Sequence, residues 1–583
     1  MPSSIVSSLL LLGLAADVTF ASPRPKPSAS CKNIPGDAAW PTKHAWDRLN
    51  ATVDGRLIAT TPIAHVCHDP TYSHEACEDL SRRWNTANTM TSLPAEIMSP
   101  WFQNQSCVPF TNQSTSCGLG NYASYSINIS SVQDIMAGLA FAKKKNVRLV
   151  IKNSGHDFFG KSTGKGALSL WTHNLNSMQV IVDYDTSYYQ GPAIKIGAGV
   201  RGGQAAKFAA QNGYRIVVGS CPTVGAAGGY SQGGGHSFLS GVYGFGADNV
   251  LEWEVVTVSG EHVVATPEQN VDLYWALSGG GGGTYGVVVS MTSRVFPDGE
   301  ISTASLSFGL GQFEGPDEYW TAVEGFIAQL QPLVDDHGIV GELVMTNETL
   351  SLFGLMAPGL TSQELQVLLS PVLSALGQTQ ANLTAETISL SVSDGGGYYE
   401  LFVATIEPLT ETNVLSPAIG GRFVSREIIA NNASAVTAAI RAATDGGRFF
   451  VAATALNVGG KSRVAAPVAD NAVQPALKDA FLSLIITAVW SWDRPWAEAE
   501  GLLSELTNVV MPVLEAATPG AGAYANEANW QQPEWQGVFY GDNYERLQSI
   551  KATYDPQGLL YGRTAVGSEA WAEDAEGRLC RTK

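Results

Sequence analysis

A histidine and a cysteine, each inside a segment of small residues, are the side chains whose types and positions most directly suggest chemistry. His156 stands in the loop Asn153–Asp157, directly after the apolar stretch Val147–Lys152. The backbone N–H groups and small side chains of such a loop can cradle a diphosphate, and an imidazole at the turn can point at a ligand. A polar surface loop is the alternative interpretation.

Cys221 lies in the segment Gly219–His236, in which seven of eighteen residues are glycine. Glycine forfeits side-chain packing and costs backbone entropy, so this density needs a reason. A large planar group that lies directly on the main chain would supply one. A purely structural turn region is the alternative.

A third glycine run, Gly279–Gly283, does not fit a dinucleotide-binding turn. That fingerprint follows a strand and opens a helix, with an acidic residue further along the chain. Here the glycines lead into Val287–Met291, which has a strand pattern, and Gly197–Gly203 matches the motif only loosely. The sequence therefore argues against a Rossmann turn.

The sequence has seven cysteines, an odd number for a protein that we expect to be exported. Two close pairs could each close a small loop, and the two terminal cysteines could join because domain ends often lie close together. These hypothetical pairs are Cys67 with Cys77, Cys107 with Cys117, and Cys31 with Cys580. Cys221 then stands outside the disulfides, and in an oxidising compartment this requires an explanation.

The first residues predict export. Residues 1–22 combine a short apolar run with small residues that end near Ala21, as in a signal peptide, although a first helix of the mature fold is the alternative. Seven N-x-Ser/Thr sequons suggest a glycosylated surface. They lie at Asn50, Asn104, Asn112, Asn128, Asn347, Asn382 and Asn432. We expect a secreted, extracellular protein.

The composition of the chain limits the kinds of partner that we expect it to bind. The net charge of −19 repels phosphate backbones, so we expect no nucleic acid partner. After the first residues no apolar run is long enough for a membrane helix, so no membrane partner is expected either. The histidines lack ligand spacing with cysteines or carboxylates, which argues against a metal site. We expect a monomer.

The chain of 583 residues is too long for one core. We expect a first domain over 23–297 with its core at 121–297, a second domain over 298–505, and a tail over 506–583 that returns to the first. Periodicity and caps predict helices at Ser131–Lys145, Gly203–Gly213, Asp317–Leu330 and Asn543–Tyr554. Strands are expected at Val147–Lys152, Ala193–Gly197, Val250–Val264 (two, around a turn), Thr303–Gly309, Gly341–Leu350, Glu400–Glu407 and Phe449–Val458.

The order of the motifs resembles the berberine-bridge-enzyme-like branch of the vanillyl-alcohol-oxidase flavoproteins, whose FAD-binding domain is of the PCMH type. The similarity covers roughly 110–300 and 520–570. It is carried by Val150–Asp157, Cys221–Gly225, Gly233–His236, Ala247–Glu252, Asp272–Gly281 and Tyr544–Pro556.

The resemblance implies an α+β fold, with a two-part FAD-binding domain and an inserted substrate domain of antiparallel sheet and helices. It implies FAD bonded twice, by His156 at the flavin 8α carbon and by Cys221 at C6. This would also explain the odd cysteine. Further contacts to FAD are expected from Ser154, Gly155, Asp157, Gly160, Ser162, Thr223, Val224, Gly225, Gly229, Gly235, Asp248, Gly286, Val288, Tyr540 and Asn543.

The activity implied by the resemblance is that of an oxidase, with hydride transfer from a substrate C–H bond and reduction of O2 to H2O2. Val224 matches a position where a small residue admits oxygen. His236 could be a base near neutral pH or a histidine bonded to backbone, and Tyr524 and the weaker candidate Glu527 could act as base or positioner.

Three substrate interpretations remain open at this point. A sugar or oligosaccharide is slightly favoured over a simple alcohol or a specialised metabolite that undergoes oxidative cyclisation, because a secreted enzyme meets glycans. A flavin-fold protein that binds a ligand without turnover is the alternative from another functional class.

Overall fold

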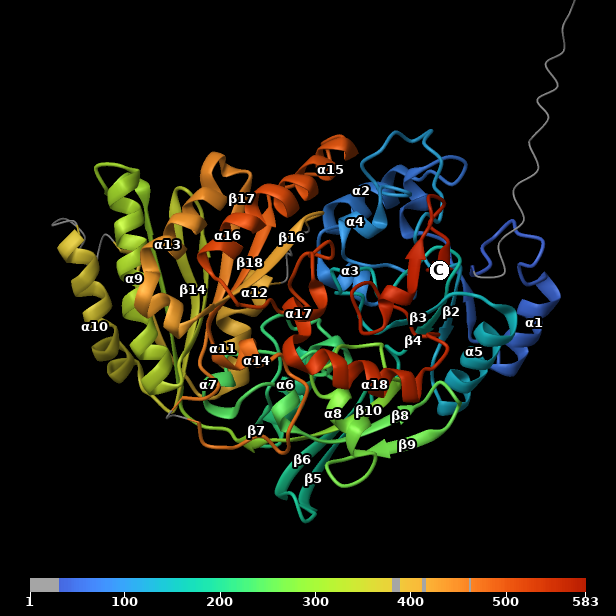
Figure 1. The fold of residues 1–583 in the computed structure, drawn as a ribbon, viewed down its shortest axis with the longest axis horizontal. Coiled ribbons are helices and arrows are strands. Elements are labelled where there is room, and N and C mark those ends of the chain that lie inside the picture. Colours follow the sequence, from blue (N-terminus) through green and yellow to red (C-terminus); the bar gives the residue numbers. More distant parts are fainter. Residues whose placement is uncertain (1–30, 380–387, 411–415, 461–462, 583) are drawn as a thin grey trace, which may run out of the picture.

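The computed structural model describes residues 31–379, 388–410, 416–460 and 463–582 (Figure 1). The expected signal peptide, 1–22, and the sequon at Asn382 lie outside these residues. The first and last parts of the chain, blue to green and red in Figure 1, form one body beside a second body made by the middle of the chain. None of the described helices is both long and apolar enough to cross a membrane.

The first sheet carries the segment that leads to His156. Its strands follow the order β1 (Leu57–Ala59), β2 (Tyr125–Asn128), β4 (Leu168–Trp171) and β3 (Leu149–Lys152). β2, β4 and β3 run parallel, whereas β1 is antiparallel to β2. Because parallel strands need a crossover, helix α5 (Val132–Lys145) connects β2 to β3.

Helix α5 shows how the sequence fixes this crossover. The Ser131 hydroxyl accepts the N–H of Asp134, and the Asp134 carboxylate accepts the N–H of Ser131. Lysines occupy the last turn, where their positive charges interact favourably with the negative end of the helix dipole. Asn146 ends the helix with φ of 51°. The helix expected over Ser131–Lys145 is confirmed.

The second sheet of the first body has five antiparallel strands. Their order is β5 (Met178–Asp185), β6 (Gln190–Gly197), β10 (Val287–Arg294), β8 (Val250–Val256) and β9 (His262–Ala265). Helices α6 (Gly202–Gln211) and α8 (Val271–Leu277) share its buried core. The glycine run Gly279–Gly283 leads from α8 into β10, so the argument against a Rossmann turn is confirmed.

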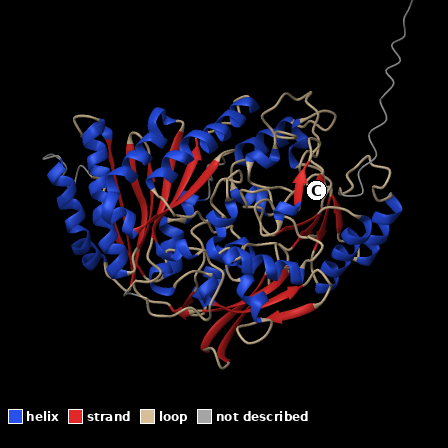
Figure 2. Ribbon diagram, in the orientation of Figure 1, coloured by secondary structure: helices blue, strands red, loops and turns tan. Residues whose placement is uncertain are grey.

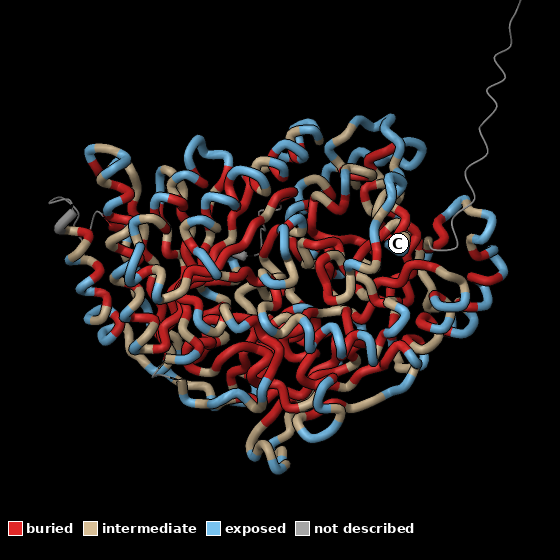
Figure 3. Tube along the Cα trace, viewed as in Figure 1, coloured by how far each residue is buried: buried red, intermediate tan, exposed pale blue. Residues whose placement is uncertain are grey.

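The second body is built on a seven-stranded antiparallel sheet with helices on one face (Figure 2). The strand order is β15 (Ser391–Gly395), β12 (Ile301–Gly309), β14 (Thr349–Pro358), β13 (Val340–Met345), β17 (Phe449–Ala455), β18 (Ala480–Ala488) and β16 (Ile419–Ser425). The covering helices are α9 (Pro316–His337), α10 (Ser362–Thr379) and α13 (Arg426–Thr444). Figure 3 shows buried backbone running through both bodies.

Two sequence expectations in this body are corrected. Glu400–Glu407 is not a strand, because Tyr398–Thr405 forms helix α11. Its aromatic and β-branched residues suggest a strand, but the buried Tyr398, Leu401 and Phe402 follow helical spacing and share one core. The single strand expected over Gly341–Leu350 is a hairpin, in which β13 ends at Met345 and β14 begins at Thr349.

The helices that follow the sheet belong to the same core. Helices α15 (Trp496–Glu505) and α16 (Met511–Ala517) bury Leu502, Leu503 and Leu514 against it. The second body therefore reaches Leu514, past the boundary expected at residue 505.

The tail then returns to the first body as α17 (Trp535–Tyr540) and α18 (Tyr544–Tyr554) (Figure 1). Helix α18 stops before Asp555-Pro556, as expected. The N-terminal part adds the short helices α1 (Lys43–Thr52), α2 (His74–Arg83), α3 (Ala87–Thr91) and α4 (Pro100–Gln103). All three hypothetical disulfides are confirmed: Cys31–Cys580, Cys67–Cys77 and Cys107–Cys117.

Candidate active site

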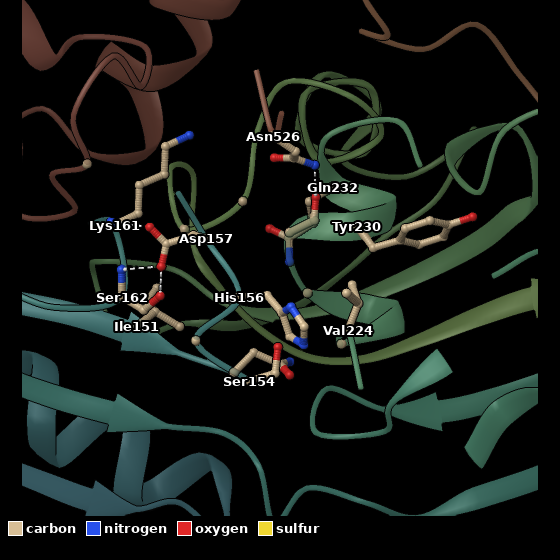
Figure 4. Close-up of a pocket in the computed structure, with 18 of the residues that line it drawn as sticks. Ile151, Ser154, His156, Asp157, Lys161, Ser162, Val224, Tyr230, Gln232 and Asn526 are labelled. Carbon is tan, nitrogen blue, oxygen red and sulfur yellow. Dashed lines mark hydrogen bonds between the residues drawn. The ribbon is translucent and has the colours of Figure 1, made fainter. Parts of the chain in front are cut away.

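A cavity of about 290 Å³ lies among the glycine-rich loops of the first body (Figure 4). Its walls come from the loop after β3, the segment 219–236, the start of β10, and the tail at 524–527 and 560–562. The chain thus brings together segments that are hundreds of residues apart. The two segments singled out by the sequence both contribute to these walls.

His156 and Cys221 converge on one hydroxyl group at this cavity. The Oγ1 of Thr223 lies 2.7 Å from Nε2 of His156 and 3.5 Å from Sγ of Cys221. Both side chains also line the cavity, together with Val224. The two reactive groups are therefore positioned to meet the same ligand.

The loop that carries His156 is fixed by its own side chains. Gly155 takes φ of +81°, a conformation that favours glycine. The Asp157 carboxylate accepts the backbone N–H groups of Lys161 (2.6 Å) and Ser162 (3.2 Å) (Figure 4). Because these contacts hold the turn, the imidazole is presented at the cavity wall.

The cavity wall includes bare backbone. A Cβ on Gly229 or Gly283, both cavity residues, would meet no atom within 4 Å. On the same walls, Asn153 Oδ1 and Gln232 Oε1 are buried without a hydrogen-bond partner among the described residues. Open main chain next to unused acceptors suits a flat ligand that has its own hydrogen-bond donors.

A second cluster, His236, Glu527 and Tyr524, lines the same cavity. Nε2 of His236 lies 3.0 Å and 3.2 Å from the two carboxylate oxygens of Glu527. The Tyr524 hydroxyl accepts the N–H of Gly235 (3.1 Å) and an N–H of Asn526 (2.8 Å). The structure therefore brings all three candidate catalytic residues together.

Comparisons with known proteins match this arrangement. The family described as FAD binding domain matches residues 123–266, and the family described as berberine and berberine like matches 523–566. A VAO-type flavoprotein oxidase from Thermothelomyces thermophilus is 43% identical over 100% of both chains. A bifunctional decalin synthase from Penicillium decumbens is 43% identical over 98% of this chain and 99% of its own.

The chain belongs to the berberine-bridge-enzyme-like branch of the vanillyl-alcohol-oxidase flavoproteins. The crystal structure of a VAO-type flavoprotein from Myceliophthora thermophila C1 superposes with a TM-score of 0.90 at 43% identity, covering 95% of this chain and 100% of that one. The protein is accordingly an FAD-linked oxidase with an FAD-binding and a substrate-binding domain. A xylooligosaccharide oxidase from the same fungus shares the fold, with a TM-score of 0.60 and 19% identity over 89% and 98% of the two chains.

Electrostatics assigns different protonation states to the two histidines of this flavoprotein. Burial, assisted by the positive charges of Lys152 and Arg201, lowers the pKa of His156 to about 3. At neutral pH its imidazole is therefore uncharged and keeps a free lone pair. For His236 burial also opposes the charge, but the Glu527 carboxylate outweighs it and the pKa rises to about 9.

The high pKa of His236 argues against one of the two roles expected for this residue. A base at neutral pH must be deprotonated, whereas His236 carries its proton there. His236 is therefore an imidazolium whose Nε2 lies within 3.2 Å of both side-chain oxygens of Glu527. Burial raises the pKa of Tyr524, so its phenol also keeps its proton.

A stability prediction follows from the raised pKa of His236. The stabilisation is fully present below the unfolded value of 6.5 and is lost as the pH rises through about 9, because only the folded state holds the proton between these values. We expect the charged pair to contribute about 3 kcal/mol at low pH. Thermal unfolding of wild type and His236→Gln should show a gap in melting temperature that closes between pH 6.5 and 9. A constant gap would contradict the assignment.

Six of the residues expected to contact FAD are not among the residues that line the cavity. Asp248 is buried and bonded to Arg463 (2.9 Å) and Asn471 (2.7 Å), which gives it a structural position. The Tyr540 hydroxyl donates to the carbonyl of Thr564, and the Asn543 amide donates to the carbonyls of Ala472 and Val473. A Cβ on Gly160 would lie 2.6 Å from the Phe102 ring. The N–H of Gly235 donates to the Tyr524 hydroxyl, and the Thr223 hydroxyl lies 2.7 Å from Nε2 of His156.

The remaining expected residues line the cavity: Ser154, Gly155, Asp157, Ser162, Val224, Gly225, Gly229, Gly286 and Val288. Sequence reasoning missed Asn153, Gln232 and Tyr561 on its walls. It also missed Glu342 on β13. Burial and the charge of Glu527 raise the pKa of Glu342, whereas His236 and Ser220 lower it. One acidic residue inside the apolar strand Val340–Met345 was the available signal.

Proposed function

We propose that this oxidase holds FAD through two covalent bonds, one from His156 and one from Cys221. The observation that carries the proposal is the position of the Thr223 hydroxyl, at 2.7 Å from Nε2 of His156 and 3.5 Å from Sγ of Cys221. Two nucleophiles gathered around one hydroxyl at a flavin cavity have the arrangement that a double attachment needs.

The contacts also favour one nitrogen of His156. Thr223 occupies Nε2, so Nδ1 is the atom left to bond the flavin 8α carbon. The low pKa of His156 keeps its imidazole uncharged at neutral pH, so that one ring nitrogen has a lone pair for the bond. Cys221 would bond C6. Such tethers fix the ring, are expected to raise its reduction potential, and permit a more open cleft.

The residues present fit FAD. The bare backbone at Gly229 and Gly283 suits a flat ring, and the unused acceptors of Asn153 and Gln232 suit its N–H group. Bound FAD supplies a two-electron acceptor that takes a hydride from a substrate C–H bond and passes both electrons to O2, which becomes H2O2. Val224 on the cavity wall supports oxygen access.

The protein's own residues handle the substrate proton. In this proposal Glu527 accepts the proton of the substrate O–H or N–H group, and His236, held charged, fixes the orientation of that carboxylate. The Tyr524 oxygen already accepts two hydrogen bonds, so its O–H is free to donate to the substrate oxygen. An alcohol loses two hydrogens to form a carbonyl compound while O2 gains them.

Acid precipitation tests the double attachment. We expect the yellow colour to stay with the precipitated wild-type protein and with the single variants His156→Ala and Cys221→Ala, since each keeps one bond. Only the double variant should release flavin into the supernatant. His44→Ala, an exposed histidine, serves as the control. Flavin released from acid-treated wild-type protein would refute the proposal.

A second candidate is an oxidative cyclase of a specialised metabolite. The relative named a decalin synthase, at 43% identity over nearly the whole chain, favours it. Peroxide release with sugars and alcohols, and product analysis with ring-forming substrates, would separate it from a simple oxidase. If no substrate gives peroxide or product, although dithionite reduces the flavin and air reoxidises it, the result would instead favour a protein that binds a ligand without turnover.

We also propose that the protein is secreted as a glycosylated monomer, with a second domain that begins near residue 298 and extends past the expected end at residue 505 into α16, whose Leu514 belongs to its core. Three disulfides support an oxidising compartment. Sequencing of the N-terminus and light scattering of the protein from culture medium test this directly.

A further inference from the structure

The seven-stranded sheet has a second face, opposite to α9, α10 and α13. Helix α11 covers this face at β12, β14 and the start of β13. On β13, β17 and β18 the side chains of Leu343, Ala453 and Leu484 are paired across the sheet and belong to the helix-covered core. Because side chains alternate along a strand, their neighbours point to the other face. The residues on that face decide what can lie between the two bodies.

Next to this core, a polar row crosses the second face. Strand pairing aligns Glu342 with Thr454, Thr454 with Ser483, and Ser483 with Phe423 on β16. The three polar residues are buried. Burial raises the pKa of Glu342, which favours its neutral form, a hydrogen-bond donor.

Two residues further along the same strands, an apolar row lies parallel to the polar one. Val344 pairs with Ala452, Ala452 with Ile485, and Ile485 with Gly421 on β16. Val344, Ala452 and Ile485 are only partly buried although they lie at the centre of the sheet. An apolar surface left open at such a place, beside an active site, is typical of a binding face.

Both rows end at the active-site cavity. Glu342 lies close to His236 and Ser220, two cavity residues. The charge of His236 and a hydrogen bond with Ser220 both lower the pKa of Glu342 against the effect of burial. At the other end, a Cβ on Gly421 would lie 2.2 Å from the carbonyl oxygen of Glu527. The N–H of Phe423 donates to the carbonyl of Gly522, so the tail segment that carries Tyr524 and Glu527 is fixed against β16.

We propose that this face binds the body of the substrate, and that the substrate is a largely apolar alcohol and not a sugar, an inference that rests on the proposed oxidase function. The reacting hydroxyl lies at Glu527 and Tyr524, and the hydrocarbon part covers the apolar row. Glu342, buried at the β13 end of the polar row, forms a hydrogen bond with a polar group of the substrate near the reacting end.

The chemistry of the apolar row distinguishes the two substrate classes. A sugar presents hydroxyl groups on all sides, and burying them against Val344, Ala452 and Ile485 would leave them without hydrogen-bond partners. A hydrocarbon chain loses nothing there and gains from leaving water. This reverses the preference for sugars that rested only on the expected location of the enzyme.

Ligand titration of the oxidised holoenzyme tests the inference. Primary alcohols of increasing chain length are mixed with it under nitrogen in a stopped-flow instrument, and each Kd is taken from the dependence of the flavin reduction rate on alcohol concentration. Xylobiose, which should not reduce the flavin, is titrated by the change in flavin absorbance. We expect the Kd of the alcohols to fall about threefold to fourfold with each added methylene until the row is covered. Peroxide release in air should follow the same order, with xylobiose inactive.

Variants make the test specific for this face. Ile485→Asn and the near-isosteric Val344→Thr should both flatten the dependence on chain length. Val367→Asn, on the exposed side of α10, should leave it unchanged. Tight xylobiose binding, no response to any alcohol, or a slope that neither variant alters would overturn the inference. Failure of the double flavin attachment would appear separately, as flavin released by acid.

Discussion

Replacing Glu527 by glutamine is expected to lower kcat by about 10²-fold to 10⁴-fold, the usual effect of losing a general base. Glutamine keeps the size of the side chain and a hydrogen bond to His236, but it cannot accept the substrate proton. Its neutral amide also removes the negative charge that offsets the cost of burying the imidazolium, so the pKa of His236 should fall below 9. The variant therefore tests the assignment of the base and of the charged partner together.

The measurement is the rate of flavin reduction under anaerobic conditions, followed by stopped flow with any alcohol that the enzyme oxidises. Covalent flavin content should match wild type, because Glu527 is not one of the attachment residues. Glu545→Gln, which removes an exposed carboxylate from α18, is the matched control. A Glu527→Gln enzyme that reduces its flavin at the wild-type rate would move the base elsewhere in the cavity.

Replacing Asp555 by alanine is expected to destabilise the protein by about 3–5 kcal/mol, since it leaves a buried lysine without its counter-charge. Lys551 Nζ donates to Asp555 and to the carbonyls of Thr284 and Leu560, each at 2.7 Å. Both charged side chains are buried. This pair fixes the tail to the end of the glycine run, so its loss should loosen one wall of the flavin cavity.

Thermal unfolding followed by flavin fluorescence would measure this effect. The double variant Lys551→Met with Asp555→Leu removes both charges at similar volume, and should recover most of the lost stability. The double variant could instead be as unstable as Asp555→Ala. In that case the stability comes mainly from the hydrogen bonds that Asp555 accepts from the N–H groups of Leu559 and Leu560, and not from the charge pair.

Local sequence signals predicted those parts of the fold whose structure is decided locally. The capping residues Ser131 and Asp134 place the start of α5 without reference to any other segment. In contrast, Tyr398–Thr405 has residues suited to either a strand or a helix, and the choice depends on the core that receives Tyr398 and Phe402. Such tertiary packing cannot be read from one segment.

The candidate site likewise contains residues that the sequence predicted and residues whose role depends on tertiary contacts. Glycine density and the odd cysteine drew attention to Cys221, and motif order to His156, and these two side chains do line one cavity. The protonation of His236 could not be predicted, because it depends on Glu527, 291 residues away. Glu342 was missed for a related reason: its importance comes from strand register and from its proximity to His236.

The bond between Cys31 and Cys580 closes the chain between these residues into a ring. A protease that cuts one surface loop would leave a single covalent molecule, and two fragments would separate only after reduction. The Cα atoms of the two cysteines are 3.9 Å apart, so a short peptide could replace the bond. New ends could then be opened at an exposed turn such as Gly446-Gly447, giving a circularly permuted enzyme with the same active site.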